Sequence, residues 1–232
     1  MFKTIEQCRL DLVAHSIGVG EFLGVDGDED VFMGKDLDDF PASAARVSFG
    51  KEDKTGKNPE ADKKLMHFLA DNNHMSPFEH QSATFLIECP LFIRSQIHRH
   101  RTFAYNEISR RYTEENLEFW IPTTFREQAK DNRQASGDSL IMSDNGMRDV
   151  AEWAVKSYSW MLKAGIAREQ ARAVLPQSLL TKFYMTGNLR NWAHFCKLRL
   201  DAHAQKEVQV VAQRISDELM KLWPTAWGVL MK

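Results

Sequence analysis

The stretch Gln96–Tyr112 reads QIHRHRTFAYNEISRRY and concentrates basic side chains in two short runs, Arg99–Arg101 and Arg110–Arg111. Between these runs lie further side chains that can bind a ligand: Tyr105, Asn106, Glu107 and Ser109. The planar guanidinium of arginine matches the oxygens of phosphate and carboxylate groups, and it stays charged when partly buried. An arginine-rich solvated face is the alternative interpretation. The close mixing of basic, aromatic and small polar residues favours a binding site for an anion.

The composition of the whole chain is that of a globular protein. Its 232 residues, of which 43% are hydrophobic, suffice for a sizeable core, so we expect a single domain spanning residues 1–232. The net charge of -2 argues against a nucleic-acid-binding protein, which needs an excess of Lys and Arg. No apolar run reaches the roughly 18 residues of a membrane span, and residues 1–10 carry charges where a signal peptide is apolar. We therefore expect a cytoplasmic protein that binds a small anion and neither a membrane nor nucleic acid.

The spacing of cysteines and histidines indicates neither a disulfide framework nor a metal site. The three cysteines lie far apart and form no C-x-x-C motif: Cys8, Cys89 and Cys196. We expect them to be small buried hydrophobic side chains. In the segment 72–80 (NNHMSPFEH), the candidate metal ligands His74, Glu79 and His80 have no further His or Cys at a usual ligand spacing. A turn that caps a helix or faces a ligand is the better interpretation of this segment.

The hydrophobic pattern predicts a mixture of strands and helices. We expect strands at 10–18, 82–89 and 180–186, and extended chain at 108–122. We expect helices at 40–49, 61–71, 90–101, 150–164 and 167–175, and one long helix at 188–223. The remaining segments are predicted to be turns, loops or surface excursions: 24–35, 51–59, 102–107 and 125–148.

Side chains three or four residues apart lie on one side of a helix, which allows faces to be assigned. The apolar stripes include Leu65, Phe68 and Leu69 on the helix at 61–71, and Val150, Trp153, Ala154 and Trp160 on the helix at 150–164. In the helix at 90–101, one turn separates Gln96 from both Arg99 and His100, so all three can reach one ligand. On the long helix, two pairs should share a side: Arg190 with His194, and Arg199 with His203.

Familiar nucleotide-binding and hydrolase motifs do not occur in this sequence. It contains no GxGxxG, no GxxxxGK[ST] and no GxSxG. The residues themselves therefore support one general statement. Arg, His, Asn, Glu and Ser side chains from separate segments could hold a phosphorylated, heteroaromatic ligand.

Six motifs, in order along the chain, resemble those of the flavin-dependent thymidylate synthases (the ThyX family). They are AARVS at 44–48, HMSPFEH at 74–80, RHR followed by seven residues and Ser at 99–109, ARAVLP at 171–176, NLR at 188–190 and LRLDAHAQ at 198–205. The match runs through nearly the whole chain. A single RHR would be weak, whereas this ordered set is very specific.

The resemblance implies a fold, a reaction and an assembly. The fold is α+β, a helix-rich single domain around a small mixed, mainly antiparallel sheet. The reaction is methylation of dUMP to dTMP, with 5,10-methylenetetrahydrofolate as carbon donor and FAD, reduced by NADPH, as hydride donor. The family uses no cysteine nucleophile, and its members are homotetramers whose active sites combine residues from several subunits.

The resemblance also implies roles for particular residues. The expected dUMP ligands are Gln96, Arg99, Glu107, Ser109, Arg111, Arg172 and Arg199. The expected FAD ligands are Ser48, Ser76, Glu79, Arg99, His100, Arg101, Asn106, Glu107, Asn188, Arg190, His194 and His203. Three residues are expected in the catalytic centre: Arg199, which would stabilise negative charge on the pyrimidine, Ser109, and His74 near the flavin and folate. Ser109 is expected to bind the nucleotide, with nucleophilic attack as the alternative.

Some residues depart from the family pattern, and two other functions stay open. Ser95, His98 and His194 stand where relatives often have Arg, an aromatic residue and Asn, which affects the details of flavin contact. A module that binds RNA or anionic nucleotides without catalysis would use the same arginines. A different flavoenzyme with a phosphorylated substrate would bind FAD but would not convert dUMP.

Overall fold

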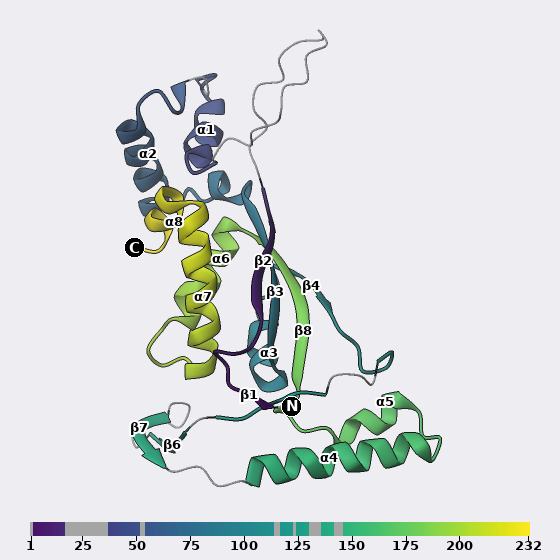
Figure 1. The fold of residues 1–232 in the computed structure, drawn as a ribbon. Coiled ribbons are helices and arrows are strands. Elements are labelled where there is room, and N and C mark those ends of the chain that lie inside the picture. The colour runs from purple at the N-terminus through teal and green to yellow at the C-terminus, as the bar shows by residue number, and fades with distance from the viewer. Residues whose placement is uncertain are drawn as a thin grey trace. The chain divides into compact units, whose positions relative to one another are not determined.

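The computed structural model describes residues 2–16, 37–51, 54–113, 117–122, 124–129, 136–141 and 146–232. It has an α+β fold, in which small sheets are combined with several helices (Figure 1). In this described part of the chain, no helix is long and apolar enough to cross a membrane. The loop expected at 24–35 lies outside the described residues.

The chain forms two compact units, and it passes between them several times. The first unit comprises Met1–Asp11, Leu86–Met185 and Leu198–Gln213. The second unit comprises Leu12–Phe85, Thr186–Lys197 and Arg214–Lys232. The single domain expected from the sequence stays a prediction.

A four-stranded sheet has the strand order β2-β3-β8-β4. Three of its strands confirm the hydrophobic pattern: β2 (Leu10–His15), β3 (Ser82–Pro90) and β8 (Leu180–Asn188). The loop expected at 102–107 is wrong, because Ala104–Glu107 forms β4 beside β8. The strand has four residues and includes Asn106 and Glu107, residue types that are depleted in strands, so its own sequence carries little strand signal. Its pairing with β8 supplies the backbone hydrogen bonds that make it a strand.

Two smaller sheets have two strands each. Strand β1 (Phe2–Lys3) pairs in parallel with β5 (Phe119–Trp120). Strands β6 (Phe125–Gln128) and β7 (Ser136–Ile141) pair antiparallel. The segment 125–148, expected to be a surface excursion, thus contains this strand pair and the start of α4 (Gly146–Lys163), elements that the sequence pattern did not predict there.

Helix α4 (Gly146–Lys163) confirms the helix expected at 150–164, but the predicted apolar stripe is only partly buried: Ala154 is buried, whereas Val150, Trp153 and Trp160 are exposed. Its buried side chains are Ala151, Ala154 and Tyr158. Trp153 and Trp160 are 72% and 67% exposed. Tyr158 packs in a core cluster of the first unit with Phe119, Leu175 and Leu179. The helical period shows that a face is apolar, but the neighbouring elements decide which face is covered.

The second unit contains α1 (Phe40–Val47), α2 (Pro59–Asp71), the short 3-10 helix η2 (Ser76–Glu79) and α8 (Pro224–Leu230). The side chain of Asn58 caps α2 by accepting a hydrogen bond from the amide of Ala61 at 3.1 Å. The predicted stripe of α2 is wrong at Phe68, which is 55% exposed. Asp62 is buried instead, and its ion pair with Arg46 offsets the cost of burying its charge.

Helix α3 (Leu91–Ile97) is shorter than expected at both ends. Pro90 ends β3 in an extended conformation, with φ -67° and ψ 152°, so the helix begins after it. At the other end, the amide of His100 donates to the carbonyl oxygen of Ile97 at 3.0 Å, a tighter turn than an α-helix. The Tyr105 hydroxyl lies 3.1 Å from the Ile97 carbonyl oxygen and 2.8 Å from that of His100. The Tyr105 hydroxyl thus adds a side-chain partner for the carbonyls at this helix end. The residues after Ile97 form a turn and lie on no common helix face.

The long helix expected at 188–223 is wrong, because it is two helices. Helix α6 (Leu189–Arg199) and helix α7 (Lys206–Leu222) are separated by a turn. In this turn the carboxylate of Asp201 accepts a hydrogen bond from the amide of His203 at 2.8 Å. Aspartate makes such local bonds in turns and competes with helix formation. Arg199 and His203 therefore do not share a helix face.

Candidate functional site

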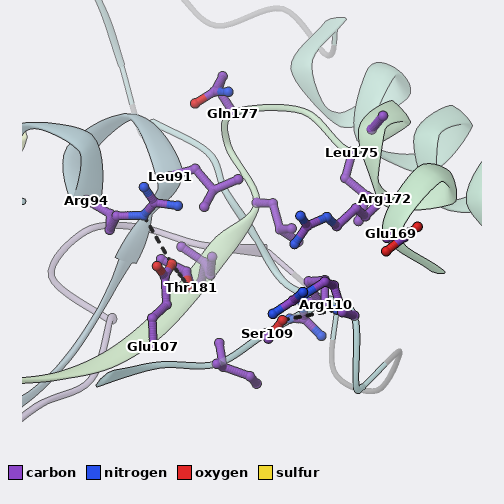
Figure 2. Close-up of a pocket in the computed structure, with 15 residues that line it drawn as sticks. Leu91, Arg94, Glu107, Ser109, Arg110, Glu169, Arg172, Leu175, Gln177 and Thr181 are labelled. Atoms are coloured by element: carbon purple, nitrogen blue, oxygen red, sulfur yellow. Dashed lines mark hydrogen bonds and ion pairs between the residues drawn. The ribbon is translucent and has the colours of Figure 1, made fainter. Parts of the chain in front are cut away.

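A cavity of about 690 Å³ opens in the first unit (Figure 2). Four segments line it: residues of α3, the end of β4 with the turn after it, the segment of α5 (Arg168–Ala171) and η3 (Arg172–Val174), and the start of β8. The lining residues with polar side chains are Arg94, Glu107, Ser109, Arg110, Arg111, Glu169, Arg172, Gln177 and Thr181. A cavity of this size can hold a small organic ligand.

Four arginines contribute positive charge to the cavity: Arg94, Arg110, Arg111 and Arg172. Among the lining residues that the structure describes, Glu107 and Glu169 are the carboxylates, so positive groups outnumber negative ones there. Burial lowers the pKa of Arg110, but an arginine pKa is so high that the group stays charged at neutral pH. Such a cavity attracts an anion that offers several acceptor oxygens.

The cavity has two distinguishable sides. In Figure 2, Arg94, Glu107 and Thr181 lie together on one side, whereas Ser109, Arg110 and Arg172 lie on the other. The first group is joined by hydrogen bonds. Glu107 Oε1 accepts from Arg94 Nε at 3.1 Å and from Thr181 Oγ1 at 2.6 Å. The side with Arg110 and Arg172 also holds Glu169, which lies beside Arg172 (Figure 2), but its arginines outnumber this carboxylate. The other side combines one cation, Arg94, with a fixed carboxylate, Glu107.

Residues Ser109–Tyr112 form a turn, so the extended chain predicted here is wrong. The amide of Tyr112 donates to the carbonyl oxygen of Ser109 at 3.0 Å, and the amide of Arg111 donates to Ser109 Oγ at 3.3 Å. The guanidinium of Arg111 lies 5.2 Å from the centre of the Tyr112 ring. The turn brings Ser109, Arg110 and Arg111 to one cavity, which an extended strand would not do because its side chains alternate.

Four of the seven expected nucleotide ligands line this cavity: Glu107, Ser109, Arg111 and Arg172. The other three, Gln96, Arg99 and Arg199, are outside the described set of lining residues. Arg99 is exposed in the turn after α3. Arg199 and Gln96 are in contact, since Arg199 Nη2 donates to the Gln96 carbonyl oxygen at 2.9 Å.

Arg199 also contacts His100, one of the expected flavin ligands. Arg199 Nε donates to His100 Nε2 at 3.0 Å, and the His100 side chain is buried. Since Nε2 accepts this bond, the imidazole is neutral and carries its proton on Nδ1. Burial lowers the pKa of Arg199. The structure thus joins an expected nucleotide ligand directly to an expected flavin ligand.

The expected flavin ligands divide between the two units. The first unit holds Arg99, His100, Arg101, Asn106, Glu107 and His203. The second unit holds Ser48, Ser76, Glu79, Asn188, Arg190 and His194. In the second unit, Arg190 in the first turn of α6 forms an ion pair with Glu79 of η2. Asn188 Oδ1, just before α6, accepts a hydrogen bond from the amide of Asn191 at 2.9 Å. In the first unit, His203 Nδ1 lies 2.9 Å from Asp201 Oδ1.

His74 follows α2 in the second unit, where its side chain is exposed. Its ring packs edge-on against Phe68, with ring centres 6.0 Å apart. Within the described ranges, no three His, Cys, Asp or Glu side chains gather where they could hold a metal ion.

Sequence reasoning assigned no role to four polar residues of the cavity lining: Arg94, Glu169, Gln177 and Thr181. Arg110 was part of the basic stretch expected to bind an anion, but it was not among the expected nucleotide ligands. Arg94 lies two residues before Gln96 on a segment that the resemblance covers, but no motif includes it. Arg110 precedes Arg111, and only the turn shows that both face one cavity. Thr181 carries no sequence signal, because a threonine in a strand is commonplace.

The sequence matches a known family model and several curated proteins. Residues 33–225 match the model described as "Thymidylate synthase complementing protein". A flavin-dependent thymidylate synthase of Kosmotoga olearia is 44% identical over 200 residues, covering 84% of this chain and 86% of that protein. One of Thermosipho africanus is 39% identical over 204 residues, covering 84% and 87%.

A solved structure is also similar. The UMP/dUMP methylase PolB of Streptomyces cacaoi, bound with 5-Br dUMP, has a TM-score of 0.80 at 29% identity. The match covers 98% of this chain and 95% of that chain. Sequence and fold similarity therefore extend over nearly the whole chain.

Proposed function

Because this chain belongs to the family of flavin-dependent thymidylate synthases, we propose that it methylates dUMP to dTMP with a flavin cofactor. In this proposal 5,10-methylenetetrahydrofolate supplies the carbon, and FAD reduced by NADPH supplies the hydride. One observation carries the proposal: the arginine-lined cavity contains four of the residues that the family resemblance assigns to the nucleotide.

The cavity suits a nucleoside monophosphate. Arg110, Arg111 and Arg172 offer guanidinium donors that match phosphate oxygens. Ser109 adds a hydroxyl at the same turn. On the other side, Glu107 can accept a hydrogen bond from a hydroxyl or an N–H of the nucleoside. A uracil nucleotide provides all of these complementary groups.

The residues expected to hold FAD fit that cofactor chemically. A flavin dinucleotide needs cations for its diphosphate and neutral donors for its heteroaromatic ring. Arg101 and Arg190 are exposed and supply the first requirement, while Asn106 and His194 are exposed and supply the second. When bound, the flavin would supply the hydride of the reaction, and the protein would orient the two reactants.

Arg199 is proposed to stabilise negative charge on the pyrimidine. Two of its nitrogens are held by protein acceptors, Nε by His100 and Nη2 by the Gln96 carbonyl. A guanidinium fixed in this way costs little reorganisation when charge develops nearby. His74 is proposed to lie close to the flavin and folate, and Ser109 is proposed to be a nucleotide ligand.

The cysteines support a route without a thiol nucleophile. Burial raises the pKa of Cys89 and that of Cys196. Cys8 is also buried, as the sequence predicts for all three. Because the thiolate is the nucleophilic form, buried and protonated thiols are poor nucleophiles. The methyl transfer must then depend on the flavin and on electrostatic activation of the uracil.

We further propose a cytoplasmic homotetramer in which each subunit is one catalytic domain. The exposed Val150, Trp153 and Trp160 of α4 support an interface between subunits, since large apolar side chains gathered on one face are commonly covered in an assembly.

The test is the reaction itself, made with purified protein. A flavin absorption spectrum is expected, and its absence would favour the nucleotide-binding module that lacks catalysis. Conversion of dUMP to dTMP in the presence of methylenetetrahydrofolate and NADPH is then expected. A flavin spectrum without dTMP formation would contradict the proposal and would favour a different flavoenzyme.

A further inference from the structure

The carboxylate of Glu107 is held from two sides in the nucleotide cavity. Arg94 Nε on α3 and Thr181 Oγ1 on β8 both donate to Glu107 Oε1, at 3.1 and 2.6 Å. The side chain of Glu107 is 23% exposed and that of Arg94 is 31% exposed, while Thr181 is buried. Three elements, α3, β4 and β8, therefore fix the position of one carboxylate (Figure 2).

The atom that both residues contact shows which part of the carboxylate is available. Because Oε1 receives both bonds, Oε2 is the oxygen that a ligand in the cavity can use. A carboxylate accepts hydrogen bonds and donates none when ionised. The ligand group at this position must therefore be a donor, such as a hydroxyl or an N–H.

Charge decides which end of a nucleotide can lie here. A phosphate beside Glu107 would meet a like charge, whereas Arg110 and Arg172 on the other side of the cavity attract it. The neutral sugar or base is thus the part that reaches Glu107. Arg94 offsets the charge of the carboxylate, so that a negative group is tolerated in a cavity that binds an anion.

We propose that Arg94 and Thr181 are positioning residues that hold the Glu107 carboxylate for a donor group on the sugar or base of dUMP. This inference rests on the proposed function and adds two residues to it. Neither residue is required to touch the nucleotide, since each acts through Glu107. Thr181 acts through one short hydrogen bond to a carboxylate. Hydrogen bonds to charged groups are stronger than those between neutral groups.

The experiment is a double-mutant cycle that measures dUMP binding to the full-length protein by calorimetry. Thr181→Val keeps the shape of the side chain and removes its hydroxyl, and we expect about tenfold weaker binding. Thr181→Ser restores the hydroxyl and should return the affinity to within roughly twofold of wild type. In a Glu107→Gln background the further effect of Thr181→Val should fall below about twofold, because its charged acceptor is gone.

Arg94 is tested in the same way. Arg94→Lys keeps the positive charge but loses the Nε donor, and it should weaken dUMP binding about tenfold in the wild-type background only. The matched control is Thr186→Val on the same strand. Thr186 Oγ1 lies 2.9 Å from Thr84 Oγ1 and contacts no cavity residue among the described hydrogen bonds, so the affinity should not change.

The outcomes separate this inference from the function on which it rests. If Thr181→Val weakened binding equally with Glu107 and with Gln at this position, or did not weaken it at all, the positioning role would be wrong. In both cases wild-type protein would still bind dUMP and the proposed function would stand. Absence of dUMP binding by wild-type protein would instead overturn the proposed function and this inference with it.

Discussion

At the scale of single residues, packing and burial determine the protonation state of a side chain. His98 is one example, because it stands where relatives often have an aromatic residue and its ring packs as one. The ring centre of His98 lies 4.2 Å from that of Tyr105, and Phe183 packs edge-on at 4.9 Å. Burial lowers the pKa of His98, and its Nε2 is a buried atom without a hydrogen-bond partner. The imidazole is therefore held in its neutral form.

His98→Phe should make the protein less sensitive to acid. The pKa of His98 is lower in the folded than in the unfolded chain, so the unfolded chain takes up the proton first. The free energy of unfolding is therefore highest above about pH 6.5. It decreases as the pH falls through the pKa that His98 has in the unfolded chain and then through its lower pKa in the folded chain. Urea unfolding of both proteins between pH 7 and 5 should show a smaller loss for the variant. An equal loss would mean that another group is responsible.

Arg172→Ala should weaken dUMP binding by roughly 10- to 100-fold, because in the proposed binding mode it removes charge-assisted hydrogen bonds to the phosphate. Arg172 is exposed at the cavity, so folding should not change. Arg168→Ala, four residues earlier and outside the described cavity lining, is the matched control and should bind dUMP like wild type. Calorimetry gives both affinities, and equal losses in the two variants would contradict a specific phosphate contact.

At the scale of elements, the ends of helices decide where the site residues lie. Helix α3 stops at Ile97, and the following turn places Arg99 and His100 in different surroundings. The break between α6 and α7 leaves Arg199 at a helix end, where it reaches His100 and Gln96. Helix α4 ends before Gly165, which has φ +81°, a conformation that glycine adopts without strain.

Two glycine substitutions should change stability in opposite directions. Gly165→Ala should lower the free energy of unfolding by about 1 kcal/mol, because alanine is strained at a positive φ. Apart from its two chain neighbours, no heavy atom lies within 4 Å of an added Cβ there, so backbone strain is the cause. Gly228→Ala, inside α8 and equally free of contacts, should raise stability by roughly 0.5 to 1 kcal/mol. Denaturant unfolding measures both, and the same sign for both would contradict this account.

At the scale of the whole molecule, the exposed face of α4 is a candidate interface between subunits of the proposed tetramer. Trp153 and Trp160 are large and mostly exposed, although their helix is amphipathic and packs on the core through Tyr158. Burial of such side chains under another subunit removes apolar surface from water and stabilises the assembly.

Replacing both Trp153 and Trp160 by Glu should reduce the mass of the assembly. Each subunit would then present two negative charges on α4, which are more costly to bury in an interface than the tryptophans they replace. Each subunit should still fold because both side chains are exposed. Light scattering measures the mass, and circular dichroism checks the helices. An unchanged mass would show that α4 is not at the interface.

The fold was predictable from the sequence wherever the signal was local. Strands β3 and β8 have enough apolar and β-branched residues to be found, and α1, α2 and α4 have a helical period or a proline at their start. Strand β4 and the pairing of β6 with β7 were missed, because partner strands complete their backbone hydrogen bonds. The buried face of α4 was assigned wrongly at Val150, Trp153 and Trp160 for the same kind of reason, since the choice of face depends on the rest of the core.

The sequence by itself determined the family of this protein and the residues that its motifs carry, because motif residues can be recognised one by one along the chain. The tertiary structure alone decided which of them meet. It brought Glu107, Ser109, Arg111 and Arg172 to one cavity, added Arg94, Arg110 and Thr181, and joined Arg199 to His100 elsewhere. Distances between residues far apart in sequence depend on turns, strand pairing and helix ends, and these are set by packing and hydrogen bonding of the whole chain rather than by local preference.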